Sequence, residues 1–288
     1  MALLDDLIVR FFALTSEYAA SSVLECAIAS AYTDMSRRTR GHKPEIQEAS
    51  VQWLKDRFVA DSPFARTSLL DFDRWHHETC EAYCRHMNSL GFSFVMTYGR
   101  AQKVLNMTFK YLYCTSAYRA SVEGITSFLH MTLDGYTLRW YKEVVLKDIN
   151  ANRAKGVAKL KVGDVSDWSK MNERGKHSYM DIQNRIRACL SGASHYHYSI
   201  NTEIIEEEAQ LNQCKNVINV AVSFDPARKQ PFFAEFIVWE GEIVRSKVEG
   251  LFKGLNATYK TWSKDEWAVN ASIKAELKSK LSVLLRTI

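Results

Sequence analysis

The residues best suited to chemistry in this chain are a lysine and an aspartate, each near the start of a predicted helix. Lys103 lies in a helix predicted over residues 98–113, where apolar side chains recur at helical spacing and form one stripe. Asp134 precedes Gly135 and a second helical pattern, which is the position of a helix cap. A lysine amine can attack an electrophilic carbon and form a Schiff base, and a carboxylate can stabilise positive charge that develops in a transition state. Lys103 and Asp134 are therefore the first candidates for a nucleophile and for a charge-stabilising group.

A second candidate pair is Glu235 and Trp239, which share one face of a helix predicted over residues 231–252. A carboxylate within such an apolar run needs a partner or a ligand if it is buried. The pair would offer a ligand a ring to stack on and a carboxylate that accepts hydrogen bonds. The simpler interpretations are that Trp239 is core, that Asp134 is only a cap and that Lys103 is solvated.

Most of the chain has helical periodicity. Helices are predicted over residues 44–60, 68–90, 98–113, 178–190, 231–252 and 264–285, with two further helical segments between residues 4 and 35. Valines alternate over residues 217–224, which is the one strand-like stretch. Residues 191–199 form a predicted loop rich in rings and hydroxyls, which either lines a pocket or makes a turn. With only four prolines and twelve glycines, the sequence favours an all-α fold.

The stretch 90–110 predicts a helix-hairpin-helix, in which the second helix opens at Gly99. Such a hairpin binds a DNA phosphate through backbone N–H groups at the start of a helix. Arg100 and Lys110 add positive charge close to Lys103 in the same helix. We therefore expect Gly99, Arg100 and Lys110 to contact DNA.

The positive charge of the chain is unevenly distributed. The formal net charge is +5, and basic residues outnumber acidic ones over residues 137–163 and again from residue 242 to the end. Such patches suit a polyanion, so Arg139 and Lys142 are predicted to contact DNA as well. On charge alone, a solvated basic face is the commoner interpretation.

Several classes of protein are disfavoured by what the sequence lacks. It has no run of eighteen apolar residues, no basic stretch before its first apolar run, and neither a phosphate-binding P-loop nor a dinucleotide-binding glycine motif. Its six cysteines do not have the spacing of a disulfide scaffold or a metal site. We therefore expect a cytoplasmic protein with no metal, no cofactor, no contact with a membrane and no obligate protein partner.

Three segments together resemble the helix-hairpin-helix superfamily of DNA glycosylases, and they are most similar to its archaeal-type 8-oxoguanine branch. The segments are Gly99-Arg-Ala-Gln-Lys103, Met131-Thr-Leu-Asp134 and Pro231-Phe-Phe-Ala-Glu-Phe-Ile-Val-Trp239. The resemblance implies that Lys103 and Asp134 are catalytic and that Glu235 and Trp239 contact the flipped base. The chain departs from that branch at Glu235, where an aspartate is usual, and at Thr132-Leu133, which contains no proline.

The predicted architecture is one two-lobed helical domain over residues 1–288, with its cleft between the lobes. The catalytic region covers about residues 85–245, and residues 246–288 form a basic C-terminal helical segment. The predicted function is that of a DNA N-glycosylase, possessing lyase activity if Lys103 forms a Schiff base. The partner is double-stranded DNA that contains a modified base.

Two substrates remain open at this stage, and one alternative class of protein. The favoured substrate is a bulky base of phage DNA, such as glucosylated hydroxymethylcytosine, because the tyrosines and histidines of residues 195–198 suit a pocket that binds a sugar. The resemblance implies defence against phages for such an enzyme. The alternative substrate is 8-oxoguanine in base-excision repair. The alternative class is a helical protein that binds nucleic acid without catalysis.

Overall fold

The computed structural model describes residues 22–37, 43–152, 158–161, 167–171, 178–192, 195–203, 215–223 and 229–259. The chain forms two compact units. One consists of Met1–Tyr196 with Val222–Glu242, and the other consists of His197–Ala221 with Ile243–Ile288. All of the predicted site residues belong to the first unit.

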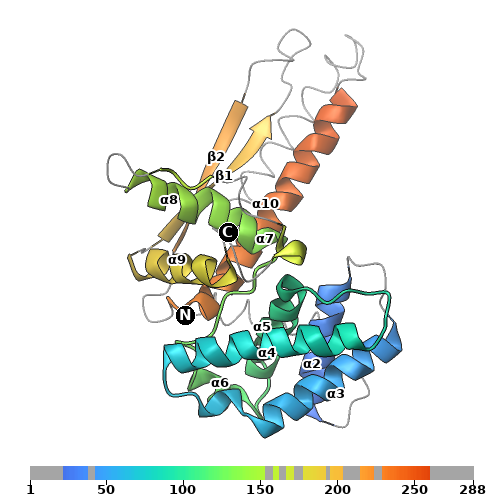
Figure 1. Cartoon of the computed structure of the whole chain (residues 1–288). Coiled ribbons are helices and arrows are strands. Elements are labelled where there is room, and N and C mark those ends of the chain that lie inside the picture. Colours follow the sequence, from blue (N-terminus) through green and yellow to red (C-terminus); the bar gives the residue numbers. More distant parts are fainter. Residues whose placement is uncertain are drawn as a thin grey trace. The chain divides into compact units, whose positions relative to one another are not determined.

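Helices make up most of the described chain (Figure 1). They are α2 (Val23–Ser36), α3 (Pro44–Ala60), α4 (Leu69–Ser89), α5 (Tyr98–Tyr113), α6 (Arg119–Glu123), α7 (Gly135–Trp140), α8 (Leu146–Ala151), α9 (Tyr179–Gly192) and α10 (Pro231–Tyr259). Short 3₁₀ turns occur at Pro63–Ala65 and Trp168–Lys170, and a π-helical segment, η2 (Tyr141–Val145), joins α7 to α8 in one continuous helix. The predicted helices over 44–60 and 98–113 have the same bounds in the structure.

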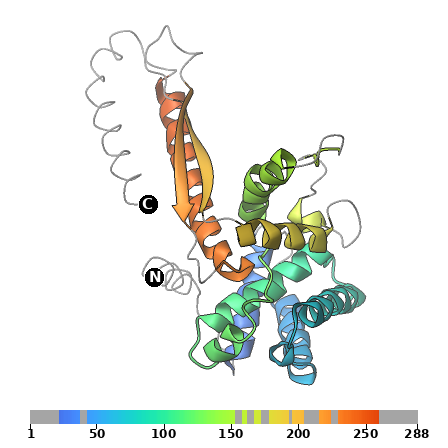
Figure 2. The same cartoon turned by 90° about the vertical axis from the view of Figure 1, so that its left-hand side faces the viewer.

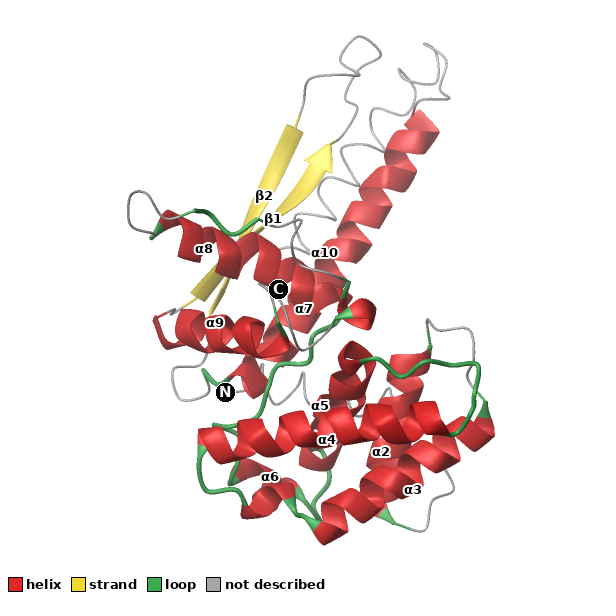
Figure 3. Ribbon diagram, in the orientation of Figure 1, coloured by secondary structure: helices red, strands yellow, loops and turns green. Residues whose placement is uncertain are grey.

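A two-stranded sheet accompanies the helices, formed by β1 (His195–Glu203) and β2 (Lys215–Ser223). In the second unit the strands run alongside the C-terminal part of α10 (Figures 1 and 2). The strand-like stretch 217–224 is thus confirmed, whereas the loop prediction is wrong for residues 195–199. The tyrosines at 196 and 198 favour an extended chain there, as aromatic residues do in strands generally. The fold is mostly helical, as predicted, but it is not purely α (Figure 3).

The basic helix expected over 264–285 lies entirely outside the described residues. So do residues 4–21 of the stretch 4–35, in which two helical segments are expected. Helix α10 continues to Tyr259, beyond its predicted end at residue 252. In the part of the chain that the structure describes, no helix has the length and apolar character needed to cross a bilayer.

Helix α5 forms the centre of the first unit. It packs against both α2 and α4, and nearly every one of its side chains is buried. Aromatic rings join it to α3 and α4 through contacts among Phe58, Phe64, Phe72, Trp75 and Phe109. Because α5 is enclosed in this way, the few polar groups it carries must find partners inside the protein.

The segment 129–134 crosses this core without being part of any helix or strand. Side chains take the place of a neighbouring strand along it. The amide of Gln183 accepts from Met131 N–H at 3.1 Å and donates to Met131 C=O at 2.6 Å. The amide of Gln102 likewise accepts from Leu133 N–H at 3.2 Å and donates to Leu133 C=O at 2.8 Å. These bonds satisfy backbone groups that would otherwise be buried without partners, and they fix the path of the chain to Asp134.

The role of Gln183 can be tested by Gln183→Leu, which keeps the volume but removes both bonds to Met131. We expect the free energy of unfolding to fall by about 2–4 kcal/mol, because two backbone groups lose their partners in the core. Chemical denaturation followed by circular dichroism measures the change. The matched control is Gln52→Leu at an exposed position of α3, which should change stability by no more than about 0.5 kcal/mol. Equal stability of the two variants would contradict this interpretation of segment 129–134.

Candidate active site

Asp134 is the N-cap of α7, as predicted, and its two carboxylate oxygens have different tasks. Oδ1 accepts from Tyr136 N–H at 2.9 Å and from Thr137 N–H at 3.1 Å. The hydroxyl of Thr137 in turn accepts from Asp134 N–H at 2.8 Å, which completes a capping box. Because the cap uses Oδ1, the second oxygen is left to face other side chains.

Oδ2 of Asp134 meets two of the other predicted site residues. Trp239 Nε1–H donates to it at 3.1 Å, and the Lys103 ammonium lies 3.6 Å away. The side chains of Lys103 and Asp134 are 12% and 8% exposed, so their ion pair is close to the surface but mostly shielded from water. The structure therefore brings together Lys103 of α5, Asp134 at the N-cap of α7 and Trp239 of α10.

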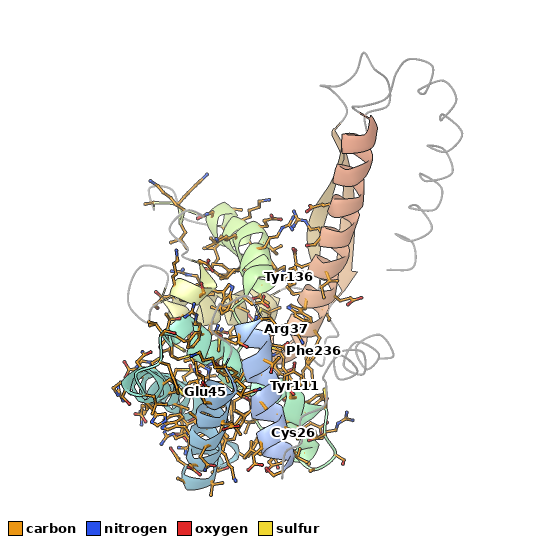
Figure 4. The ribbon with its side chains drawn as sticks, turned by 90° about the vertical axis from the view of Figure 1, so that its right-hand side faces the viewer. Cys26, Arg37, Glu45, Tyr111, Tyr136 and Phe236 are labelled. Atoms are coloured by element: carbon orange, nitrogen blue, oxygen red, sulfur yellow. The ribbon has the colours of Figure 1, made fainter. Side chains whose placement is uncertain are left out.

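Two further rings surround this group. Tyr136 of α7 meets Trp239 edge to face, with ring centroids 6.0 Å apart, and Figure 4 labels Tyr136 at this end of the helix. Trp168 lies over Lys103, with the Nζ atom 4.8 Å from the ring centroid. A cation at that distance from an indole face is held by the ring quadrupole as well as by its carboxylate.

Trp168 reaches Lys103 because the segment 167–171 docks on the N-terminus of α5. Thr97 donates through its hydroxyl to Ser169 C=O at 2.7 Å, and Gly99 N–H donates to Met171 C=O at 3.2 Å. A Cβ atom on Gly99 would lie 1.7 Å from the Trp168 carbonyl oxygen, so only glycine fits. The prediction that Gly99 N–H binds a DNA phosphate is therefore wrong for this structure, because a protein carbonyl occupies it.

Glu235 and Lys110 form a second ion pair, deeper in the first unit. Their Nζ–Oε2 distance is 2.7 Å, and the two side chains are only 5% and 1% exposed. Thr132 N–H also donates to Glu235, and the rings of Phe232 and Phe236 flank the ammonium (Figure 4 labels Phe236). Burial raises the pKa of Glu235, and the Lys110 ammonium opposes that rise.

This pairing corrects one prediction and removes support from another. The prediction that Lys110 contacts DNA is wrong, because its ammonium is sealed in the core beside Glu235. The case for Glu235 as a base-reading group was that a buried carboxylate needs a partner, and Lys110 is that partner. Because Glu235 is buried and already bound to Lys110, its carboxylate offers no free hydrogen-bond acceptor to a base.

The remaining predicted DNA contacts lie closer to the surface. Arg100 donates to Val95 C=O, and its guanidinium lies 4.7 Å from the centre of the Phe94 ring. Arg139 is 31% exposed and lies 3.6 Å from Glu143 and 3.5 Å from Glu242. Carboxylates therefore offset much of its charge. Lys142 is half-exposed on η2. Contact of these three side chains with DNA stays a prediction.

Sequence reasoning missed Trp168 as a part of this site. The residue lies in a polar stretch with no helical or strand pattern, so nothing in the local sequence indicates that it returns to cover Lys103. The glycine at position 99 was the available signal, since a buried helical glycine often marks a close approach of another backbone. Within the described residues, no cluster of three His, Cys, Asp or Glu side chains is placed to hold a metal ion.

No protein-family model matches the chain, and neither a curated protein nor a solved structure was found that is similar to it.

The docking of segment 167–171 can be tested by Gly99→Ala. The added methyl must displace the Trp168 carbonyl, and we expect a loss of about 1–3 kcal/mol in the free energy of unfolding. The control is Gly192→Ala, where a Cβ meets no atom within 4 Å and alanine should be neutral or slightly stabilising. Thermal and chemical denaturation measure both. If Gly99→Ala is as stable as the wild type, segment 167–171 does not pack on α5 in solution.

Proposed function

We propose that the chain is a DNA N-glycosylase whose catalytic pair is Asp134 and Lys103. The observation that carries the proposal is the meeting of Lys103 Nζ, Asp134 Oδ2 and Trp239 Nε1 in one place. These residues come from three elements that are far apart in the sequence. A cap alone needs only one carboxylate oxygen, so the convergence of a cation and an indole N–H on the other oxygen supports a use beyond capping.

Asp134 would act on the charge that develops when the base leaves. Breaking an N-glycosidic bond builds positive charge on the sugar, and a fixed carboxylate stabilises it without having to reorganise. The capping box and the side-chain bonds along segment 129–134 give Asp134 Oδ2 a fixed direction. The same oxygen could orient a water molecule for attack on the sugar.

Lys103 would supply the nucleophile in a bifunctional version of the reaction. Its neutral amine attacks C1′ of the sugar, the bond to the base breaks, and the electron pair leaves with the base. The nitrogen must give up a proton before it attacks, and Asp134 Oδ2 at 3.6 Å is the nearest described carboxylate oxygen that can take it. The nitrogen of the adduct then loses a proton, and its electron pair expels O4′, which takes up a proton as the sugar ring opens. The product is the protonated imine that links Lys103 to C1′ of the DNA.

Rings close to the pair support a substrate with a flat base. Trp239 and Tyr136 lie edge to face beside Asp134, and Trp168 covers Lys103. A base flipped out of DNA gains stacking energy from such rings. We retain the two substrate versions, a bulky base of phage DNA and 8-oxoguanine. The case for a sugar-binding loop at residues 195–198 is weaker now that they lie in β1.

The first test of catalysis is Asp134→Asn. Asparagine caps helices as well as aspartate does, so the fold should persist. Its amide would present either a donor or a neutral oxygen to Lys103 and Trp239, and the negative charge would be gone. We expect release of the modified base to fall about 100-fold or more, while DNA binding is retained.

Chromatography of the released base measures the effect of Asp134→Asn, and gel-shift assays measure binding. Plain DNA, DNA with glucosylated hydroxymethylcytosine and DNA with 8-oxoguanine serve as substrates, so the same assay decides between the two versions. Asp148→Asn, at an exposed position of α8, is the control and should keep full activity. Full activity of Asp134→Asn would show that the Asp134 carboxylate is not needed for base release. DNA binding without base release from any substrate would favour the non-enzymatic alternative.

The second test traps the imine. Borohydride added during the reaction should link the protein covalently to substrate DNA, and Lys103→Ala should abolish the adduct. Lys147→Ala, at an exposed position of α8, is the control and should trap like the wild type. Base release without any trapped complex would make the enzyme monofunctional, with Asp134 and water doing the chemistry.

A further inference from the structure

A chain of hydrogen bonds leads from Asp73 of α4, which is part-buried, into the core. The Arg187 guanidinium of α9 donates to both of its oxygens, at 2.8 and 3.0 Å. His130, which lies in segment 129–134, contacts Asp73 Oδ1 through Nε2 at 2.7 Å. Burial works against ionisation of Asp73, but the bonds from His130 and Arg187 hold its pKa at about 2. A carboxylate can only accept, so the proton of His130 lies on Nε2.

That proton fixes the next bond in the chain. With Nε2 protonated and the ring neutral, Nδ1 of His130 is an acceptor, so the Tyr179 hydroxyl donates to it across 2.9 Å. Tyr179 in turn accepts from Asn106 Nδ2–H at 2.9 Å. Donation therefore runs in one direction only: Asn106 donates to the Tyr179 hydroxyl, and that hydroxyl donates to His130.

The other end of the chain reaches the backbone beside Asp134. Asn106 Nδ2 donates its second hydrogen to Gln102 Oε1 at 3.0 Å. That oxygen also accepts from Leu133 N–H, and Gln102 Nε2 donates to Leu133 C=O. Asn106 Oδ1 accepts from Nε2 of His76 at 2.9 Å. Both amides are thus oriented by their neighbours, and neither can turn over without losing bonds at both ends.

We infer that Tyr179 and His130 are positioning residues that hold the Asp134 carboxylate in place through this directed hydrogen-bond chain. Segment 129–134 is held at His130 by Asp73 and Tyr179 and at Leu133 by Gln102, so both of its ends depend on the same chain. The expected effect on catalysis rests on the proposed function. The orientation of segment 129–134 is independent of that function and can be measured without any substrate.

The chain also requires neutral histidines. A second proton on His130 would meet the Tyr179 hydroxyl, which would then have no acceptor for its own hydrogen. His130 faces Asp73 and His76 of α4 and Tyr179 and Arg187 of α9. Burial lowers its pKa from 6.5 to about 4, with Asp73 opposing the shift and Arg187 reinforcing it. The unfolded chain therefore takes up this proton first, and the stability that His130 contributes is complete above about pH 6.5 and declines as the pH falls towards about 4.

The experiment compares Tyr179→Phe with Tyr83→Phe. Both tyrosines are buried, but the Tyr83 hydroxyl contacts Ser50, outside this chain. The reporter is the Trp239 indole N–H, which donates to Asp134 Oδ2 and has its own resonance in ¹H–¹⁵N spectra. We expect Tyr179→Phe to move or broaden that resonance and Tyr83→Phe to leave it unchanged. An unmoved resonance in Tyr179→Phe would overturn the inference, whatever the protein does to DNA.

Two further measurements complete the test. In histidine-labelled wild type, the ¹⁵N shifts of His130 should show a neutral ring protonated at Nε2 from pH 7 down to about pH 4.5, and a charged ring at pH 6 would overturn the inference. With a substrate that the wild type cleaves, Tyr179→Phe should lower kcat about 10- to 100-fold with KM unchanged, since small displacements of a catalytic group are costly. Tyr83→Phe should keep kcat. Wild-type kcat in Tyr179→Phe would also overturn the inference, whereas an inactive wild type would refute only the proposed function.

Discussion

The constraint on which the rest of this structure depends is the need to satisfy an extended backbone that crosses a helical core. Segment 129–134 has no strand beside it, yet its buried N–H and C=O groups require partners. Helices α5, α9 and α10 provide them by turning Gln102, Gln183 and Glu235 inward. Each of these polar side chains is costly to bury alone and becomes favourable only where it meets the segment. The helices are therefore held to one arrangement by a piece of chain that belongs to none of them.

Three of the carboxylates that are shielded from water, Asp73, Asp134 and Glu235, differ in how closely they meet their cations. Asp73 lies 2.8 Å from Arg187, and Glu235 lies 2.7 Å from Lys110. Further hydrogen bonds hold both carboxylates in place. Asp134 lies farther from its cation, 3.6 Å from Lys103, although this pair is no more exposed than Asp73 and Arg187. A closely fitting pair that is shielded from water costs several kcal/mol to disturb. Under the proposed function, the more widely spaced pair is the one that would exchange its partner for a substrate.

The sequence was sufficient for the parts of the fold that depend on local pattern. Helices such as Pro44–Ala60 and Tyr98–Tyr113, and the cap at Asp134, follow from spacing and from a polar residue before a helix. The proximity of Lys103 to Asp134 was expected only from the resemblance, because no spacing rule links two residues on different helices. The burial of Lys110 could not be foreseen either. A lysine on a helix is usually solvated, and the carboxylate that draws this one inward lies far along the chain.

The π-helical segment η2 is the place where the helix that spans α7 and α8 holds one residue more than regular α geometry requires. A π turn accommodates one residue more than an α turn, and α7, η2 and α8 run on as one helix from Gly135 to Ala151. Removing one residue from η2 would therefore restore α geometry while the side chains beyond it kept their directions, with Leu146 buried and Lys147 exposed as they are now. Removing one residue from α8 would instead rotate the residues after it by about 100°. The helix that runs from Gly135 to Ala151 thus has one segment in which its length can change by a residue without turning its buried face to water.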